Sequence, residues 1–92
     1  MSNTFTARIE LFDCKMAWHY VSVPIELSEP LKVFADRGMI AVTATVGSSS
    51  WPTSLVPMGD GTHFIALAAK IRKKENLTLG DEVEVCFELR QR

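Results

Sequence analysis

The amino-acid sequence predicts a mostly-β protein, one small barrel whose two halves are alike. Two observations support this prediction. Residues 18–23 (WHYVSV) are echoed 44 residues on by residues 62–67 (THFIAL). Each run leads through a short helix-like segment and a glycine, Gly38 or Gly80, into another alternating strand. Neither half is large enough to bury its apolar face alone, so the two halves are expected to close around a common core.

The first half spans about residues 3–46 and begins with two predicted strands. Apolar and polar side chains alternate over residues 5–11, which predicts one strand with one buried face. Residues 13–15 read as a turn. A second strand over residues 18–23 is expected to stop at Pro24, which cannot donate to a strand ladder.

A helix and a third strand are expected to complete this half. Ser28 is a good N-cap residue, so the helix is predicted to begin there, with Phe34 among the side chains that face the core. Gly38 is placed to end the helix in the left-handed conformation. Residues 39–46 are rich in β-branched side chains and predict a strand.

The second half spans about residues 51–89. Residues 47–50 (GSSS) read as a flexible connection between the halves. The strand expected over residues 51–58 contains Pro52 and Pro57, so it should lie at an edge or at a split in the sheet. Gly59-Asp60-Gly61 is a tight hairpin signal.

The remaining elements are a fifth strand over residues 62–68, a helix over residues 70–77 and a sixth strand over residues 82–89. In the turn before the last strand, the Asp81 carboxylate is expected to accept backbone N–H bonds and so to hold the turn. Residues 90–92 read as a solvated tail.

Length and composition indicate one domain, residues 1–92, without a global electrostatic bias. An apolar fraction of 47% is ample for one core, and a net charge of −1 gives no field that would draw the chain to nucleic acid or to a membrane. No apolar run approaches the roughly 18 residues of a membrane span, and Met1 to Thr4 lack the features of a signal peptide. Cys14 and Cys86 read as buried thiols of a cytoplasmic protein, although a disulfide between them is possible if their strands pair.

Several short motifs occur together and in order along the chain. They are Phe5-x-Ala7, Trp18-x-Tyr20-Val21-x-Val23-Pro24, Trp51-Pro52-Thr53-Ser54-Leu55-Val56-Pro57, Gly59-Asp60-Gly61, Ile71-Arg72-Lys73 and Leu79-Gly80-Asp81-Glu82-Val83. With these motifs the chain resembles a prokaryotic family of small domains of unknown function. Some members of that family are fused to bacteriocin-protection segments of the YdeI/OmpD-associated type. The resemblance covers nearly the whole chain.

The resemblance implies a six-stranded double-split β-barrel, built from two ββαβ repeats and capped by two short helices. Its fold relatives include the barrels of AbrB- and MazE-type transcription regulators, which dimerise to complete one barrel. A duplicated chain is expected to complete the barrel alone, as a monomer. Family members often carry Ala-Gly where this chain has Glu75-Asn76. Because Asn tolerates the left-handed conformation, we expect the second helix to end there all the same.

Four side chains are the candidates for a ligand-binding site: Trp51, Ser54, Arg72 and Lys73. A tryptophan beside hydroxyl groups on a proline-broken strand is placed to line a small pocket. Arginine suits a bidentate grip on a carboxylate or a phosphate, and Arg72 falls on the family motif, although an internal partner such as Asp60 would serve it equally.

The opposing interpretation is structural. Trp51 would then plug the barrel, and the basic cluster at residues 70–74 would be a solvated helix face. His19 and His63 occupy matching repeat positions, but they are expected on equivalent outer faces, far apart and without a third metal ligand. No nucleophile elbow surrounds the serines of residues 48–50, and no pair of carboxylates has assignable acid and base roles.

The sequence therefore predicts a non-enzymatic binding or interaction module, without metal or cofactor, in which Arg72 holds a small anionic group. The partner would be a small molecule or a protein. The alternative is a DNA-binding regulator, by analogy with AbrB-type barrels alone, and the near-neutral charge weighs against it. A hydrolase or transferase would need an acid–base pair that the sequence does not reveal.

Overall fold

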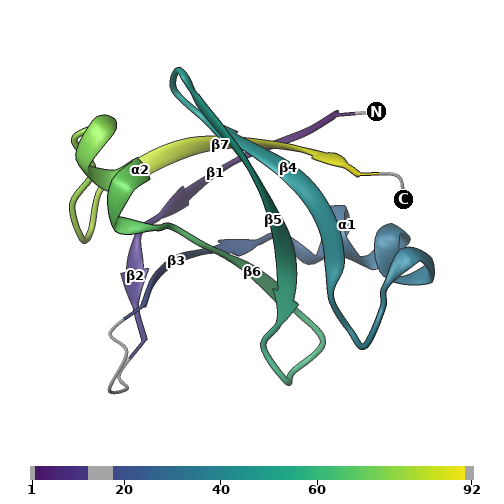
Figure 1. Ribbon diagram of the computed structural model, residues 1–92. Coiled ribbons are helices and arrows are strands. Elements are labelled where there is room, and N and C mark those ends of the chain that lie inside the picture. The colour runs from purple at the N-terminus through teal and green to yellow at the C-terminus, as the bar shows by residue number, and fades with distance from the viewer. Residues whose placement is uncertain (1, 13–17, 91–92) are drawn as a thin grey trace.

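The computed structural model describes residues 2–12 and 18–90, which form a nearly closed barrel of seven strands (Figure 1). The strands are Ser2–Arg8 (β1), Glu10–Leu11 (β2), His19–Val23 (β3), Ile40–Val46 (β4), Ser49–Pro57 (β5), His63–Ala66 (β6) and Glu82–Leu89 (β7). The helical segments are Ile25–Ser28 (α1), the 3₁₀ helix Glu29–Phe34 (η1) and Ala69–Lys74 (α2). The turn expected at residues 13–15, with Cys14, lies outside the described residues.

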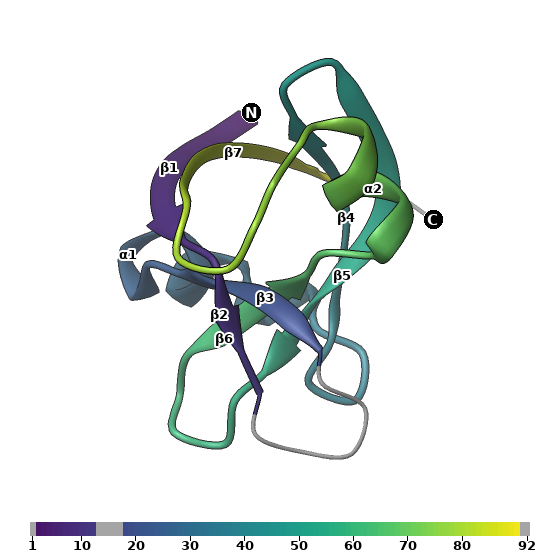
Figure 2. The same cartoon turned by 90° about the vertical axis from the view of Figure 1, so that its left-hand side faces the viewer.

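The sheet curls back on itself because its two outermost strands are consecutive in the chain. The strand order is β1-β7-β4-β5-β6-β3-β2, and β1 leads directly into β2 (Figure 2). The chain bends between them at Ile9, which is 1% exposed. The Ile9 N–H donates to the Asp81 carbonyl at 2.9 Å, and the Gly80 N–H donates to the Ile9 carbonyl at 3.0 Å. The single strand predicted over residues 5–11 is therefore two strands, and the barrel has seven strands instead of six.

Side-chain alternation places the core as predicted. Every second residue of β4, from Ile40 to Val46, is buried, and β7 buries Val83, Val85 and Phe87. These two strands are paired with each other and lie in the middle of the sheet, where both edges of each strand are occupied. The β-branched residues fit this pleated surface, which is buried on one side.

The first helical segment begins earlier than predicted. It starts after Pro24, whose carbonyl accepts the N–H groups of Leu27 at 2.9 Å and Ser28 at 3.2 Å. Ser28 is the N-cap residue of η1, as predicted, but it is fully buried and its hydroxyl makes no capping hydrogen bond. Phe34 was expected to face the core but is 58% exposed, because η1 has three residues per turn and ends at this position.

Gly38 and Gly47 have left-handed backbones, but the turns in which they lie are not those that the sequence analysis predicted. Gly38, with φ +82°, lies in a tight turn in which Asp36 and Met39 exchange backbone hydrogen bonds, four residues after η1 ends. Gly47, with φ +59°, is the first central residue of a two-residue hairpin turn between β4 and β5. The flexible connection predicted at residues 47–50 is therefore wrong, since a tight hairpin joins the two halves.

β5 runs unbroken through both of its prolines. It pairs with β4 over residues 49–55 but with β6 only at Val56 and Pro57. Pro52 thus lies where β5 has a single neighbour, as expected for a strand at a split in the sheet. Arg90 beyond β7 is not a free tail, because its Nε donates to the Val42 carbonyl at 2.9 Å and its Nη2 donates to the Thr53 carbonyl at 3.0 Å.

α2 ends at Lys74, three residues before the predicted end at residue 77, but Asn76 takes the left-handed conformation as predicted. Asn76 has φ +56°, the Leu77 N–H donates to the Arg72 carbonyl at 2.8 Å, and the Asn76 N–H donates to the Lys73 carbonyl at 3.4 Å. This is a Schellman ending with Asn in the place that glycine usually takes. α2 lies at one end of the barrel and α1 with η1 at the other (Figures 1 and 2).

Candidate functional site

A cavity of about 430 Å³ lies between α2 and the barrel. It is lined by Trp18, His19, Trp51, Thr53, Ala66, Leu67, Ala68, Ala69 and Arg72. We call it the Arg72 cavity. Its volume falls in the lower part of the range of small-ligand pockets, and its lining combines two indole rings with few polar groups, which is typical of such sites.

The orientation of α2 decides which of its basic side chains reaches the cavity. Ile71 is buried and anchors the helix on the barrel. Successive helical residues are about 100° apart, so Arg72 lies on one flank of the helix, and Lys70 and Lys74 lie together on the other. Lys73 lies opposite Ile71 and is exposed.

Arg72 is held in place and has no counter-ion among the described residues. Its Nε donates to the Leu67 carbonyl at 3.1 Å, which leaves both terminal nitrogens of the guanidinium group without a hydrogen bond to the described part of the chain. Lys32 and Glu29 form an ion pair at 2.9 Å, whereas Arg72 forms none with a described residue. Arg72 is half-buried, so its charge is partly shielded from water at the cavity wall.

Asp60 is not the internal partner of Arg72 that the sequence left open. Its carboxylate accepts the backbone N–H of Thr62 at 3.0 Å and the Thr62 hydroxyl at 2.5 Å, within the β5–β6 hairpin. These hydrogen bonds, the hydroxyl first, lower the pKa of the Asp60 carboxyl from its ordinary value. Asp81 likewise holds its turn, as predicted, by accepting the backbone N–H of Thr78 at 2.9 Å.

Two of the four predicted site residues lie together and two do not. Trp51 and Arg72 line the same cavity. Ser54 is on the opposite face of β5 from Trp51, because strand side chains alternate, and Thr53 takes the place that was expected of it. Lys73 lines a separate surface depression with Arg72, Asn76 and Thr78, on the side of α2 away from Trp51.

The sequence reasoning missed Trp18 and His19, which enter the Arg72 cavity from the start of β3. Trp18 is 44% exposed, and His19 Nδ1 is buried without a hydrogen-bond partner in the described residues. The alternation of side chains along the strand could have placed His19, because it shares the inward face of β3 with Val21 and Val23. The prediction of an outer-face position for this histidine was therefore wrong.

A second cavity, of about 420 Å³, lies on the other flank of α2. Its lining residues are Ser48, Ser49, Ser50, Trp51, Ala68, Lys70, Ile71 and Lys74. We call it the Lys70 cavity. Glu75 ties its serine hairpin to α2, since the carboxylate accepts the Ser49 hydroxyl at 2.6 Å and the Ser48 hydroxyl at 3.2 Å. The hydrogen bond from Ser49 is the largest cause that lowers the pKa of the Glu75 carboxyl.

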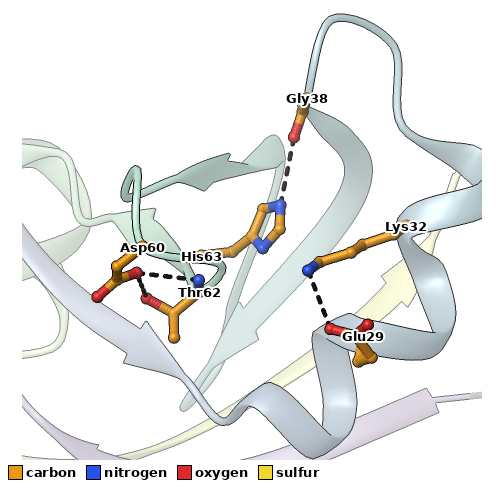
Figure 3. Close-up of polar contacts among 6 residues, drawn as sticks. All are labelled: Glu29, Lys32, Gly38, Asp60, Thr62 and His63. Carbon is orange, nitrogen blue, oxygen red and sulfur yellow. Dashed lines mark hydrogen bonds and ion pairs between the residues drawn. The ribbon is translucent and has the colours of Figure 1, made fainter.

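A third cavity, of about 400 Å³, lies near the far end of the β3–β6 ladder and is lined in part by Lys32, Pro57 and His63. His63 is 4% exposed, so its predicted outer position is wrong, and its Nε2 lies 3.2 Å from the Gly38 carbonyl (Figure 3). His63 is opposite Val23 in the β3–β6 ladder. At the other end of that ladder, the backbone carbonyl of His19 accepts a hydrogen bond from the Leu67 N–H. The two histidines therefore lie apart, as expected, and no three potential metal ligands gather in the described residues.

These observations define the class of protein: a small β-barrel domain with open cavities on both flanks of a short cationic helix. The family model described as "Domain of unknown function (DUF1905)" matches residues 5–86, and the chain belongs to this family. No curated protein matches the chain. Within residues 2–12 and 18–90, no helix has both the length and the apolar character that crossing a membrane requires.

Proposed function

We propose that this domain is a non-enzymatic binding module that holds a small organic anion in the Arg72 cavity. We further propose that its barrel follows a six-stranded double-split plan of two repeats. The continuity of β1 and β2 through Ile9 supports this plan, because the two can be counted as one bent strand.

The single observation that carries the proposed function is an oriented guanidinium group without a counter-ion, facing a cavity that contains two indole rings. The hydrogen bond from Nε to the Leu67 carbonyl fixes the plane of the group. Its two terminal nitrogens remain to grip a carboxylate or a phosphate with paired hydrogen bonds. Because the group is half-buried, such a bond is less weakened by water than one at an open surface.

The rest of the cavity favours an apolar, planar body for the ligand. Trp18 and Trp51 offer large aromatic surfaces, and Ala68 and Ala69 leave room beside them. The Thr53 hydroxyl, the His19 ring and the two indole N–H groups are the other hydrogen-bonding side-chain groups of the lining. Aromatic carboxylates and aryl phosphates combine these two features.

Isothermal titration calorimetry with benzoate and with its neutral isostere benzamide tests the proposal. We expect saturable binding of benzoate and markedly weaker binding of benzamide. Arg72→Gln should weaken benzoate binding about ten-fold, the effect of losing one charge-assisted hydrogen-bonded contact. Lys73→Gln is the matched control, since it removes the same charge from the adjacent residue, which does not line the cavity. Equal binding of the two probes, or equal loss in both variants, would contradict the proposal.

DNA binding is distinguished by salt dependence. The basic side chains of α2 are divided between two flanks and the outer face, so they do not make one continuous surface. Suppose that the chain binds duplex DNA and that its affinity falls steeply with salt concentration, with a log–log slope that corresponds to several phosphate contacts. That result would favour a DNA-binding regulator instead.

A further inference from the structure

We infer that the natural ligand of this site carries two anionic groups on either side of a planar ring, and that it spans both flanks of α2. This inference rests on the proposed function of the Arg72 cavity and extends it to the Lys70 cavity. The ligand class is an aromatic or similarly flat dianion, with the ring against Trp51, one acidic group on Arg72 and the other toward Lys70 and Lys74.

The first support is that the two cavities are neighbours that share part of their lining. Trp51 and Ala68 line both of them, so the space on one flank of α2 adjoins the space on the other at these two side chains. Each cavity holds about 400 Å³ or slightly more, and together they exceed what a ring with one acidic group fills. Ala68 has only a methyl group, so it fills little of the space beside Trp51.

The second support is the distribution of charge around Trp51. Lys70 and Lys74 are four residues apart, hence on one helix flank, and both line the Lys70 cavity. Arg72 lies on the opposite flank. None of the three forms an ion pair with a carboxylate of the described residues. A ligand centred on Trp51 thus meets positive charge on both sides.

The third support concerns Glu75, an acidic side chain near the Lys70 cavity. Glu75 uses a single carboxylate oxygen, Oε2, to accept the hydroxyl groups of Ser48 and Ser49, and it holds the hairpin that forms the far wall. These two hydrogen bonds explain the position of the Glu75 side chain, and no contact with Lys70 or Lys74 is needed to explain it. The charge of Lys74 is the last of the causes that lower the pKa of the Glu75 carboxyl, but neither Lys70 nor Lys74 forms an ion pair with a carboxylate of the described residues.

Three isosteric probes test the inference by calorimetry: benzoate, benzene-1,4-dicarboxylate and benzene-1,2-dicarboxylate. The 1,4-isomer places its charges on opposite sides of the ring, and the 1,2-isomer carries the same charge on one side. We expect the 1,4-isomer to bind about ten-fold more tightly than benzoate and more tightly than the 1,2-isomer. The double variant Lys70→Gln, Lys74→Gln should abolish that advantage while changing benzoate affinity less than about two-fold.

Lys73→Gln is again the control and should leave the preference for the 1,4-isomer intact. Equal affinities of the two dicarboxylates, or an equal loss in the Lys73→Gln variant, would show general electrostatic attraction and overturn the inference. If benzoate binds through Arg72 but the 1,4-isomer gains nothing, the proposed function stands and the dianion inference fails. If benzoate itself does not bind, the proposed function fails first.

Discussion

Val21 and Ile65 lie directly opposite each other in the antiparallel β3–β6 pair, and both are fully buried. They are also 44 residues apart, which is the spacing of the sequence repeat. An antiparallel pair has a local two-fold axis, so equivalent residues that face each other place that axis at the pair. The β3–β6 pair therefore supports the proposed plan of two repeats.

The first prediction is that the chain folds as a monomer. β1 and β2 lie at the two ends of the strand order and are adjacent in sequence, so one copy brings the sheet round to its own start. The midpoint of thermal unfolding should be the same at 2 and at 200 µM, and sedimentation should give one species of 10.3 kDa. A midpoint that rises with concentration would instead indicate a barrel completed by a second copy.

The strands were predictable from sequence because their signal is local. The alternation of side chains from Ile40 to Val46 predicts a strand with one buried face, and the structure confirms this strand. The bend at Ile9 was not predictable, because its hydrogen bonds come from Gly80 and Asp81, more than 70 residues away. The missing hydrogen bond from the Ser28 hydroxyl was not predictable either, because the burial of this side chain depends on the whole fold.

The site was half predictable for a related reason. Trp51 and Arg72 stood out by residue type, and alternation along β5 was enough to place Thr53, and not Ser54, on the same face as Trp51. Which face of β5 lines the cavity depends on packing. The rotation of α2 about buried Ile71 likewise selects Arg72 over Lys73. Register and rotation are set by packing, which a single sequence does not record.

A second prediction concerns Gly47. Alanine there must adopt φ +59°, and its Cβ would overlap Glu75 Oε1 and come within 2.9 Å of Glu75 Cδ. The backbone strain alone costs about 1–2 kcal/mol, and displacement of the carboxylate adds to it. Urea unfolding should show a larger loss for Gly47→Ala than for Gly59→Ala, which has φ +95° but nothing within 4 Å of its Cβ. Equal losses would mean that the contact with Glu75 carries no weight.

A third prediction is the pH dependence of the Glu75 tie. The Ser49 hydroxyl lowers the pKa of the folded Glu75 carboxyl below its ordinary value of 4.5. A carboxyl with a depressed folded pKa stabilises the protein above its unfolded pKa, and this contribution is lost as the pH falls through the folded pKa. The difference in thermal midpoint between the natural chain and Glu75→Gln should be full at pH 7 and shrink progressively below about pH 4.5. A difference that is constant from pH 7 to pH 3 would contradict the assignment.

The fourth prediction separates ligand binding by Arg72 from a structural role. Its side chain makes one hydrogen bond to the described residues, to the Leu67 carbonyl, and is half-buried. Arg72→Ala should therefore reduce the free energy of unfolding by less than about 1 kcal/mol. A loss above about 2 kcal/mol in urea unfolding would mark Arg72 as part of the folding network and not as a ligand anchor.

The most direct test of anion binding at the Arg72 cavity is an NMR titration of the ¹⁵N-labelled chain with benzoate. We predict that the indole N–H signals of Trp18 and Trp51 and the Nε–H signal of Arg72 shift together along one saturation curve, while the backbone amide of Lys73 shifts less. Signals that do not saturate, or shifts that are largest at Lys73 and spread over the other lysines, would contradict a site between the two tryptophans and the arginine.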